Sequence, residues 1–137
     1  TIELKGEIPE ELRPGLGDWV FGCDICQQVC PWNRFAPEAG EAVFAPRGGV
    51  PAPDLAAELS LTEEQFREKF KGSPVLRTKR RGYLRNVAVA LGNQGDAGAI
   101  PALERALEED AESLVRGHAG WAVEQMQRKN FHRRERR

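Results

Sequence analysis

Apolar residues recur at helical spacing through the second half of the chain. Leu84, Val87, Ala88 and Leu91 follow the i, i+3, i+4, i+7 rule, which predicts a helix with one buried stripe. Glycines at 92 and 95 are expected to end it. Two more helices are expected over 99–109 and 112–127. Their apolar candidates are Ile100, Leu103 and Leu107 in the first, and Leu114, Val115, Trp121, Ala122 and Met126 in the second.

Capping signals predict shorter helices before these. Asp54 can cap a helix through about residue 59, and Thr62 to Gln65 forms a capping box that opens a helix through Phe70. Residues 8–14 fit a single helical turn. Residues 36–53 contain four prolines and three glycines in eighteen positions, which predicts a connector without regular structure. The pattern therefore predicts a mainly α fold.

Two of the expected helices resemble each other. Residues 87–91 and 119–123 share a small-apolar texture at an offset of 32, and residues 96–103 look like the start of a HEAT-like repeat. We expect four parts: an N-terminal segment (1–35), a connector (36–53), a HEAT-like helical domain (54–128) and a basic tail (129–137). The tail is expected to be disordered or docked on an acidic partner.

The charge is distributed unevenly along the chain. Residues 1–53 carry four Lys/Arg and eight Asp/Glu, a net of −4, whereas residues 54–137 carry sixteen and thirteen, a net of +3. No apolar run approaches the roughly 20 residues of a membrane span, so we expect a soluble protein without a membrane partner. The first residue is Thr1, and we interpret the chain as the C-terminal piece of a longer, cytoplasmic protein.

All three cysteines lie within eight residues. Cys23, Cys26 and Cys30 have the spacing C-x2-C-x3-C and are followed by a proline, which is the second half of an iron-sulfur run. A structural zinc site is the competing interpretation, and three cysteines without a metal is another. The two histidines, His118 and His132, lie far along the sequence from the loop, so nothing near it completes a zinc site.

Aromatic residues bracket the cysteines. Trp19, Phe21, Trp32 and Phe35 could form an apolar shell around a cluster, or they could be ordinary core residues. The sequence alone leaves both interpretations open.

A basic run precedes the first long helix. Arg77, Lys79, Arg80, Arg81 and Arg85 fall within nine residues, and like charges at a helix N-terminus oppose the helix dipole. A polyanion would compensate them, and a solvated charge run is the alternative. DNA, folded RNA and an acidic protein all satisfy the electrostatics. Arg116 and His118, on the last expected helix, are further candidates.

These segments together resemble one family, the cobalamin-dependent epoxyqueuosine reductases, which are related to the reductive dehalogenases. The resemblance covers most of residues 1–127. It rests on GCDICQQVCPWNRFA from Gly22, on RTKRRG from Arg77, on residues 1–14, 72–74, 84–86 and 90–93, and on VRGHA from Val115.

The resemblance implies reduction of epoxyqueuosine to queuosine at the wobble position of tRNA. It implies that residues 1–35 are the C-terminal part of a ferredoxin-like segment with two 4Fe-4S clusters, with Cys23 and Cys26 on one cluster and Cys30 on the other. It also implies a cobalamin beside Cys23 and Asp24. Other cluster ligands and the general acid are expected upstream, so this chain alone should be inactive. The tRNA-binding residues would be Arg77, Lys79, Arg80, Arg81, Arg85 and Arg116, with Lys5 and His118 as additions.

The expected partners are a tRNA with a queuosine-type anticodon and an electron donor protein or reductant, and we expect a monomer. Two alternatives stay open at this point. One is an electron-transfer module with a helical protein-interaction scaffold, and the other is a zinc-stabilised helical adaptor. Salt-dependent binding of tRNA and metal analysis distinguish them.

Overall fold

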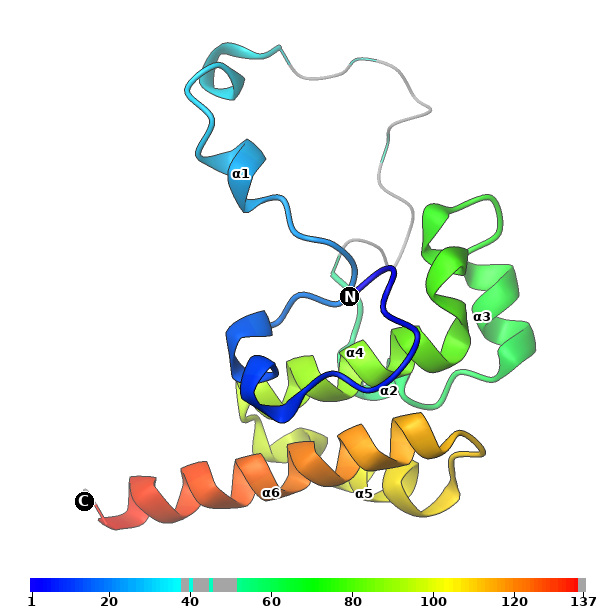
Figure 1. The fold of residues 1–137 in the computed structure, drawn as a ribbon, viewed down its shortest axis with the longest axis vertical. Coiled ribbons are helices and arrows are strands. Elements are labelled where there is room, and N and C mark those ends of the chain that lie inside the picture. The colour runs from blue at the N-terminus through cyan, green and yellow to red at the C-terminus, as the bar shows by residue number, and fades with distance from the viewer. Residues whose placement is uncertain (38–39, 41–44, 46–51, 136–137) are drawn as a thin grey trace.

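The computed structural model describes residues 1–37, 40, 45 and 52–135, with residues 130–135 as backbone only. These residues form helices and loops without a β-strand, which confirms the mainly α class (Figure 1). The α-helices are α1 (Ile25–Gln28), α2 (Leu55–Glu58), α3 (Glu63–Lys69), α4 (Lys79–Gln94), α5 (Ile100–Glu109) and α6 (Ser113–Glu135). Short 3-10 turns cover Glu10–Leu12, Pro14–Leu16, Asn33–Phe35, Pro74–Thr78 and Ala97–Ala99.

The two predicted caps are confirmed. The Asp54 carboxylate accepts hydrogen bonds from the first turn of α2, at 3.0 Å from the Ala56 nitrogen. At α3 both halves of the capping box are present: Gln65 N–H donates to the Thr62 hydroxyl, and Thr62 N–H donates to the Gln65 side chain. These bonds satisfy N–H groups that a helix start otherwise leaves unpaired.

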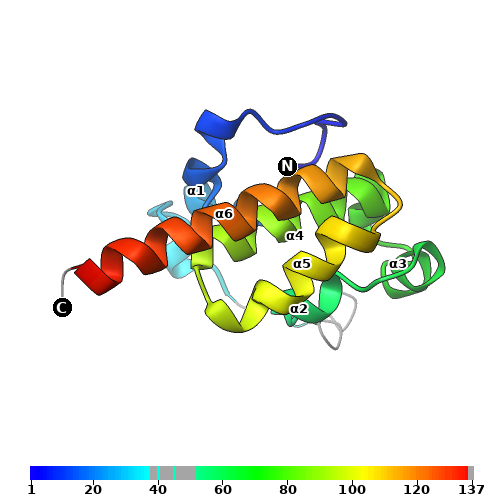
Figure 2. The same ribbon diagram turned by 90° about the horizontal axis from the view of Figure 1, so that it is seen from below.

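Helix α4 lies at the centre of the helical body. It runs in the same direction as α6, and α5 runs in the opposite direction (Figure 2). Two contacts fix this arrangement: Arg80, early in α4, pairs with Asp110 after α5, and Lys129, late in α6, bonds the carbonyl of Asn93 at 2.7 Å. The core residues with no exposed surface are Leu84, Val87, Ala88, Ala90, Leu103, Val115, Ala119, Ala122 and Met126.

Gly92 does not end α4, contrary to the sequence prediction. The helix continues through it to Gln94 and ends at Gly95, whose φ of 73° is left-handed. A Cβ at position 92 would lie 2.9 Å from both Cα and Cβ of Ala122. Gly92 is therefore present because α6 passes close to α4, and Gly95 because the chain turns there.

Two predictions about α5 and α6 were wrong. Leu107 is 38% exposed, and Ala106 is buried beside Leu103 instead. Helix α6 was predicted to end at about residue 127 but runs to Glu135, so the backbone of the basic tail is helical through that residue. Docking of the tail on an acidic partner stays a prediction. Residues 136 and 137, and most of the connector at 36–53, lie outside the described residues. None of the described helices is long and apolar enough to span a membrane.

The first twenty-two residues pack on the helices, whereas the cysteine loop that follows projects away from them (Figure 1). Ile8 is buried, and its N–H donates to the ring of His118 in α6 at 3.1 Å. The Asn93 amide of α4 donates to the carbonyls of Arg13 and Gly17, at 2.8 and 2.7 Å. The boundaries predicted for the ferredoxin-like segment and the HEAT-like domain stay predictions.

Candidate functional site

The cysteine loop is built around the single turn of α1. Gln28 N–H donates to the Asp24 carbonyl at 2.9 Å, and the Asn33 side chain donates to the Gln27 carbonyl at 2.9 Å. Cys26 therefore sits on the helical turn, and Cys23 and Cys30 flank it. All three thiols are free; Cys23 and Cys26 are exposed and Cys30 is partly buried.

The donor chemistry of this loop fits an iron-sulfur cluster. Free, accessible thiols are the soft ligands that iron-sulfur clusters take. Within the described part of the chain, however, no three His, Cys, Asp or Glu side chains converge as a metal site would require. The loop thus offers three ligands and does not complete a site by itself.

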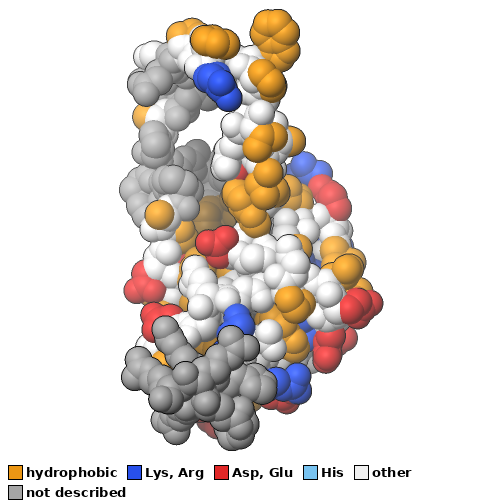
Figure 3. All heavy atoms as spheres, turned by 90° about the vertical axis from the view of Figure 1, so that its left-hand side faces the viewer, with side chains coloured by type: hydrophobic (Ala, Val, Ile, Leu, Met, Phe, Trp, Pro, Cys, Tyr) orange, Lys and Arg blue, Asp and Glu red, His pale blue; other side chains and the backbone are white. Residues whose placement is uncertain are grey.

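The expected aromatic shell does not form within the described residues. Trp32 and Phe35 are 84% and 81% exposed, while Trp19 and Phe21 are half-buried. Hydrophobic side chains gather on the projecting segment at the top of Figure 3. Trp32 and Phe35 are therefore neither core residues nor a closed shell around the thiols.

Cys23 and Asp24, the predicted cobalamin contacts, line an open cavity of about 870 Å³. Its walls come from the segment before the cysteines and from the helical body. The other lining residues are Asp18, Trp19, Val20, Phe21, Ala52, Pro53, Leu55, Phe70, Val75, Tyr83 and Gln94. The wall is largely apolar, and the Cys23 thiol and the Asp24 carboxylate are its exposed polar groups beside the cysteine loop.

Four cationic side chains form what we call the basic edge: Lys5, Arg77, Lys79 and Arg81. Lys5 lies far from the others in sequence, but its ammonium donates to the Arg77 carbonyl at 2.8 Å. Arg77 is exposed and pairs with Glu3. Lys79 is exposed and Arg81 half-exposed on the first turn of α4. The fold therefore joins the N-terminal segment to the predicted RNA-binding run.

Lys79 has a strained backbone. Its φ of 58° makes it the one non-glycine residue with positive φ in the described ranges. Such a conformation costs on the order of 1–3 kcal/mol and is concentrated at functional sites. The strained residue lies in the middle of the basic edge.

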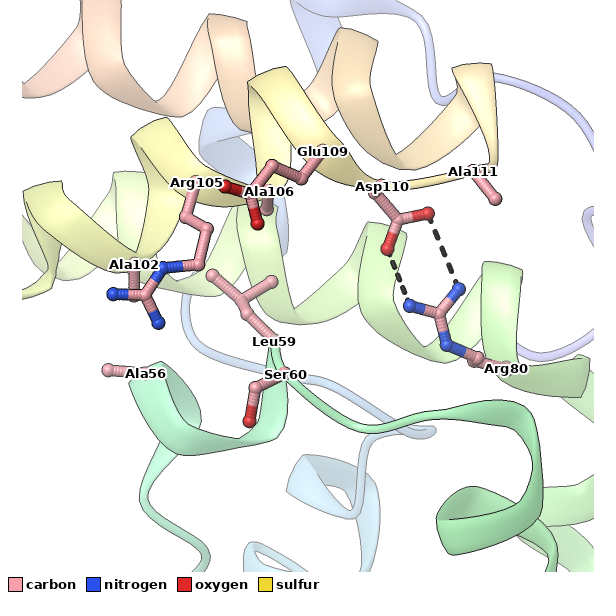
Figure 4. A pocket seen from close by; sticks show the side chains of 10 residues that line it. All are labelled: Ala56, Leu59, Ser60, Arg80, Ala102, Arg105, Ala106, Glu109, Asp110 and Ala111. Carbon is pink, nitrogen blue, oxygen red and sulfur yellow. Dashed lines mark hydrogen bonds and ion pairs between the residues drawn. The ribbon is translucent and has the colours of Figure 1, made fainter.

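Arg80 and Arg116 have internal partners. Arg80 donates to both carboxylate oxygens of Asp110, at 3.3 and 2.5 Å, and to the Leu61 carbonyl at 2.5 Å (Figure 4). Asp110 also accepts from the N–H of Glu112 at 2.9 Å. Arg116 donates to the carbonyl of Asp110 at 2.6 Å. Asp110, which sequence reasoning missed, thus neutralises Arg80, one of the cations at the start of α4 that were expected to need a polyanion.

Arg85 and His118 are fully buried, so in this structure neither is available to a phosphate group. Arg85 donates to backbone carbonyls of the N-terminal segment. The His118 Nδ1–H donates to the Leu114 carbonyl at 2.7 Å, and its Nε2 accepts from Ile8. Burial lowers the pKa of His118 and outweighs the bond to the Leu114 carbonyl, which raises it. In this arrangement the ring is neutral, because its Nε2 accepts a hydrogen bond.

Comparison with protein families finds a match to the 4Fe-4S double cluster binding domain over residues 1–33. Curated relatives named epoxyqueuosine reductase match nearly the whole chain. The protein from Pseudomonas aeruginosa is 47% identical over 90% of this chain and 34% of its own length. The protein from Escherichia coli is 43% identical over 95% of this chain and 34% of its own. The chain spans about a third of the length of these relatives.

Solved structures agree with these sequence matches. A crystal structure of epoxyqueuosine reductase with a tRNA-Tyr epoxyqueuosine-modified tRNA stem loop superposes with a TM-score of 0.85 and 30% identity, covering 91% of this chain and 33% of that one. The enzyme from Bacillus subtilis gives a TM-score of 0.84 at 30% identity, with 91% and 34% covered. The resemblance predicted from the sequence is therefore confirmed: over nine tenths of its length this chain is similar to about one third of an epoxyqueuosine reductase.

Proposed function

We propose that this chain is part of an epoxyqueuosine reductase, which reduces epoxyqueuosine to queuosine at the wobble position of tRNA. The observation that carries the proposal is the match over nine tenths of the chain to curated reductases. In this proposal the chain supplies cluster ligands and an RNA-binding surface. It does not carry the whole catalytic site and is inactive alone.

Cys23 and Cys26 would ligate one 4Fe-4S cluster and Cys30 another, and the remaining ligands come from outside this chain. Free, accessible thiols and the match to a double-cluster model support this assignment. Cys23 and Asp24 would contact a cobalamin at the edge of the apolar cavity that they line. Bound clusters would supply electron transfer, and a bound cobalamin would supply the reducing chemistry. The three thiols of this chain would hold iron, and Asp24 would contact the edge of the cobalamin.

The basic edge is the proposed RNA surface. Lys79, at its centre, has a strained backbone and an exposed side chain, and Lys5 is held beside it through the Arg77 carbonyl. Cationic side chains neutralise phosphates without reading sequence. Arg80 and Arg116 lie close by. The charge of Arg80 is already neutralised by the Asp110 carboxylate, whereas Arg116 bonds backbone carbonyls and keeps its positive charge. Arg85 and His118 act instead through the N-terminal segment, so the proposed surface does not include them.

Binding of an anticodon stem loop tests the RNA assignment. In the full-length protein, Lys79→Glu with Arg81→Glu should weaken binding strongly and flatten its dependence on salt, with the slope falling by about one for each phosphate that is no longer neutralised. Arg128→Glu is the matched control, since Arg128 is exposed near the far end of α6 and pairs with Glu124 on the same helix. Equal binding by the double variant and the wild type would leave the electron-transfer module as the better interpretation.

The proposed enzyme acts as a monomer in the cytoplasm. It takes electrons from a donor protein or small reductant, and its RNA partner carries a queuosine-type anticodon. The solved relative bound to a modified tRNA stem loop supports the choice of RNA over the other polyanions.

A further inference from the structure

Arg85 has every donor of its guanidinium in use. Arginine carries five N–H groups, and the structure gives Arg85 five hydrogen bonds. Two go to the side-chain oxygen of Asn86, at 3.0 and 2.9 Å. The other three go to the carbonyls of Leu4, Gly6 and Thr1, at 2.9, 2.6 and 3.3 Å. The side chain therefore binds three points of the N-terminal segment at once.

Asn86 extends the same contact to the entrance of the cysteine loop. Its amide donates to the Thr1 carbonyl at 2.9 Å and to the Val20 carbonyl at 2.7 Å. The Gly22 N–H donates to the Thr1 hydroxyl at 3.1 Å. Residue 1 and residues 20–22 are thus fixed against one point of α4, and Cys23 is the next residue along the chain.

The charge of Arg85 has no counterion in the described part of the chain. Its acceptors are all neutral carbonyl or amide oxygens, and no carboxylate forms an ion pair with it. Arg80 on the same helix does have a counterion, because its guanidinium forms an ion pair with the Asp110 carboxylate. Burial also lowers the pKa of Arg85. A buried cation without a counterion is costly, so a nearby negative group is expected to offset it.

We propose that Arg85 and Asn86 are positioning residues for the iron-sulfur cluster ligated by Cys23. They fix the backbone that presents this thiol, and the positive charge of Arg85 offsets the negative charge of the thiolate-ligated cluster. Because a nearby cation favours the more negative, reduced cluster, Arg85 raises its reduction potential. This inference rests on the proposed function.

The test uses the full-length reductase, purified without oxygen, with iron and sulfide counted and the cluster potential measured by redox titration followed by EPR. Asn86→Asp keeps the size of the side chain, replaces two donors with acceptors that face the Thr1 and Val20 carbonyls, and adds a negative charge. Asn93→Asp is the matched control, because Asn93 lies on the same helix and donates to the carbonyls of Arg13 and Gly17 in the same segment.

We expect Asn86→Asp to lower the iron content and the potential of the cluster that remains, while Asn93→Asp keeps wild-type values. A second pair separates charge from geometry. Arg85→Lys and Arg85→Gln both lose some of the five guanidinium hydrogen bonds. Only Arg85→Gln also loses the positive charge, so only this variant should lower the reduction potential of the cluster.

Three results would overturn the inference. The first is wild-type iron content and potential in both Asn86→Asp and Arg85→Gln. The second is an equal change in Asn93→Asp. The third is loss of helical circular dichroism and of RNA binding together with iron, which would mean that the pair supports the whole fold. If the wild-type protein itself contains no iron or sulfide, the proposed function fails instead.

Discussion

Gly92→Ala should destabilise the fold, although alanine is the better helix former. Gly92 lies inside α4, where α6 crosses it. An added Cβ would lie 2.9 Å from three atoms: the Cα and Cβ of Ala122 and a ring carbon of Trp121. Two of these atoms belong to a short, buried residue that cannot rotate away, so the helices must separate.

Two opposing effects set the magnitude. Replacing glycine by alanine within a helix gains about 1 kcal/mol of helix propensity. Overpacking a tight core contact costs about 1–3 kcal/mol, and a clash with backbone belongs at the upper end of that range. The net expectation is a loss of about 1–2 kcal/mol in the free energy of unfolding.

Gly117→Ala provides the matched control. Gly117 lies within α6 and is exposed, and a Cβ added there would meet no neighbouring atom within 4 Å. Alanine there should gain about 1 kcal/mol from propensity alone. Urea unfolding followed by far-ultraviolet circular dichroism measures both variants. If Gly92→Ala stabilises the protein as much as Gly117→Ala does, α4 and α6 do not approach as closely as the structure shows.

Three further predictions concern the site and its supports. Lys79→Gly should raise the free energy of unfolding by roughly 1 kcal/mol, because glycine accepts positive φ, and yet weaken stem-loop binding; a loss of stability in a urea titration would refute the strain. Asp110→Ala should cost about 3 kcal/mol in the same titration, because it leaves the largely buried Arg80 unpaired, and a change below about 1 kcal/mol would contradict this. Burial lowers the pKa of His118 below its usual 6.5, so the unfolded chain takes up this proton first, and the free energy of unfolding should fall as the pH drops below about 6.5; His118→Gln should lose this part of the pH dependence in unfolding curves measured between pH 7 and pH 5.

Local signals predicted the helices well because they act over a few residues. The caps at Asp54 and Thr62 and the stripe from Leu84 to Leu91 depend only on neighbouring positions. Gly92 failed as a stop signal because its role depends on α6, thirty residues away. A glycine within a helical pattern gives the same local sequence signal in two cases: where it ends the helix, and where it allows a second helix to pack closely.

The basic run shows the same division between local and distant information. The sequence identified a cluster of cations, but it could not show which of them have internal partners. Asp110 neutralises Arg80 from thirty residues away, and three of the five hydrogen bonds of Arg85 go to carbonyls about eighty residues away. The sequence offered one hint about Asp110: it lies just before a predicted helix, at a position where a carboxylate commonly caps the helix N-terminus.

The cysteine loop could be assigned a chemistry from spacing, but its surroundings could not be predicted. The three thiols are free, as ligands must be, and the flanking aromatics Trp32 and Phe35 are exposed rather than closed around them. The exposure of the aromatics does not depend on local sequence, because it is set by what else packs against the loop.

The most direct test is conversion of epoxyqueuosine to queuosine in a tRNA anticodon stem loop by the full-length protein, followed by mass spectrometry of the digested nucleosides. The wild-type protein should convert the substrate when a reductant is supplied, and the variant with Cys23, Cys26 and Cys30 all changed to serine should not. Conversion that survives removal of the three thiols, or no conversion by an iron-loaded wild-type protein, would contradict the account.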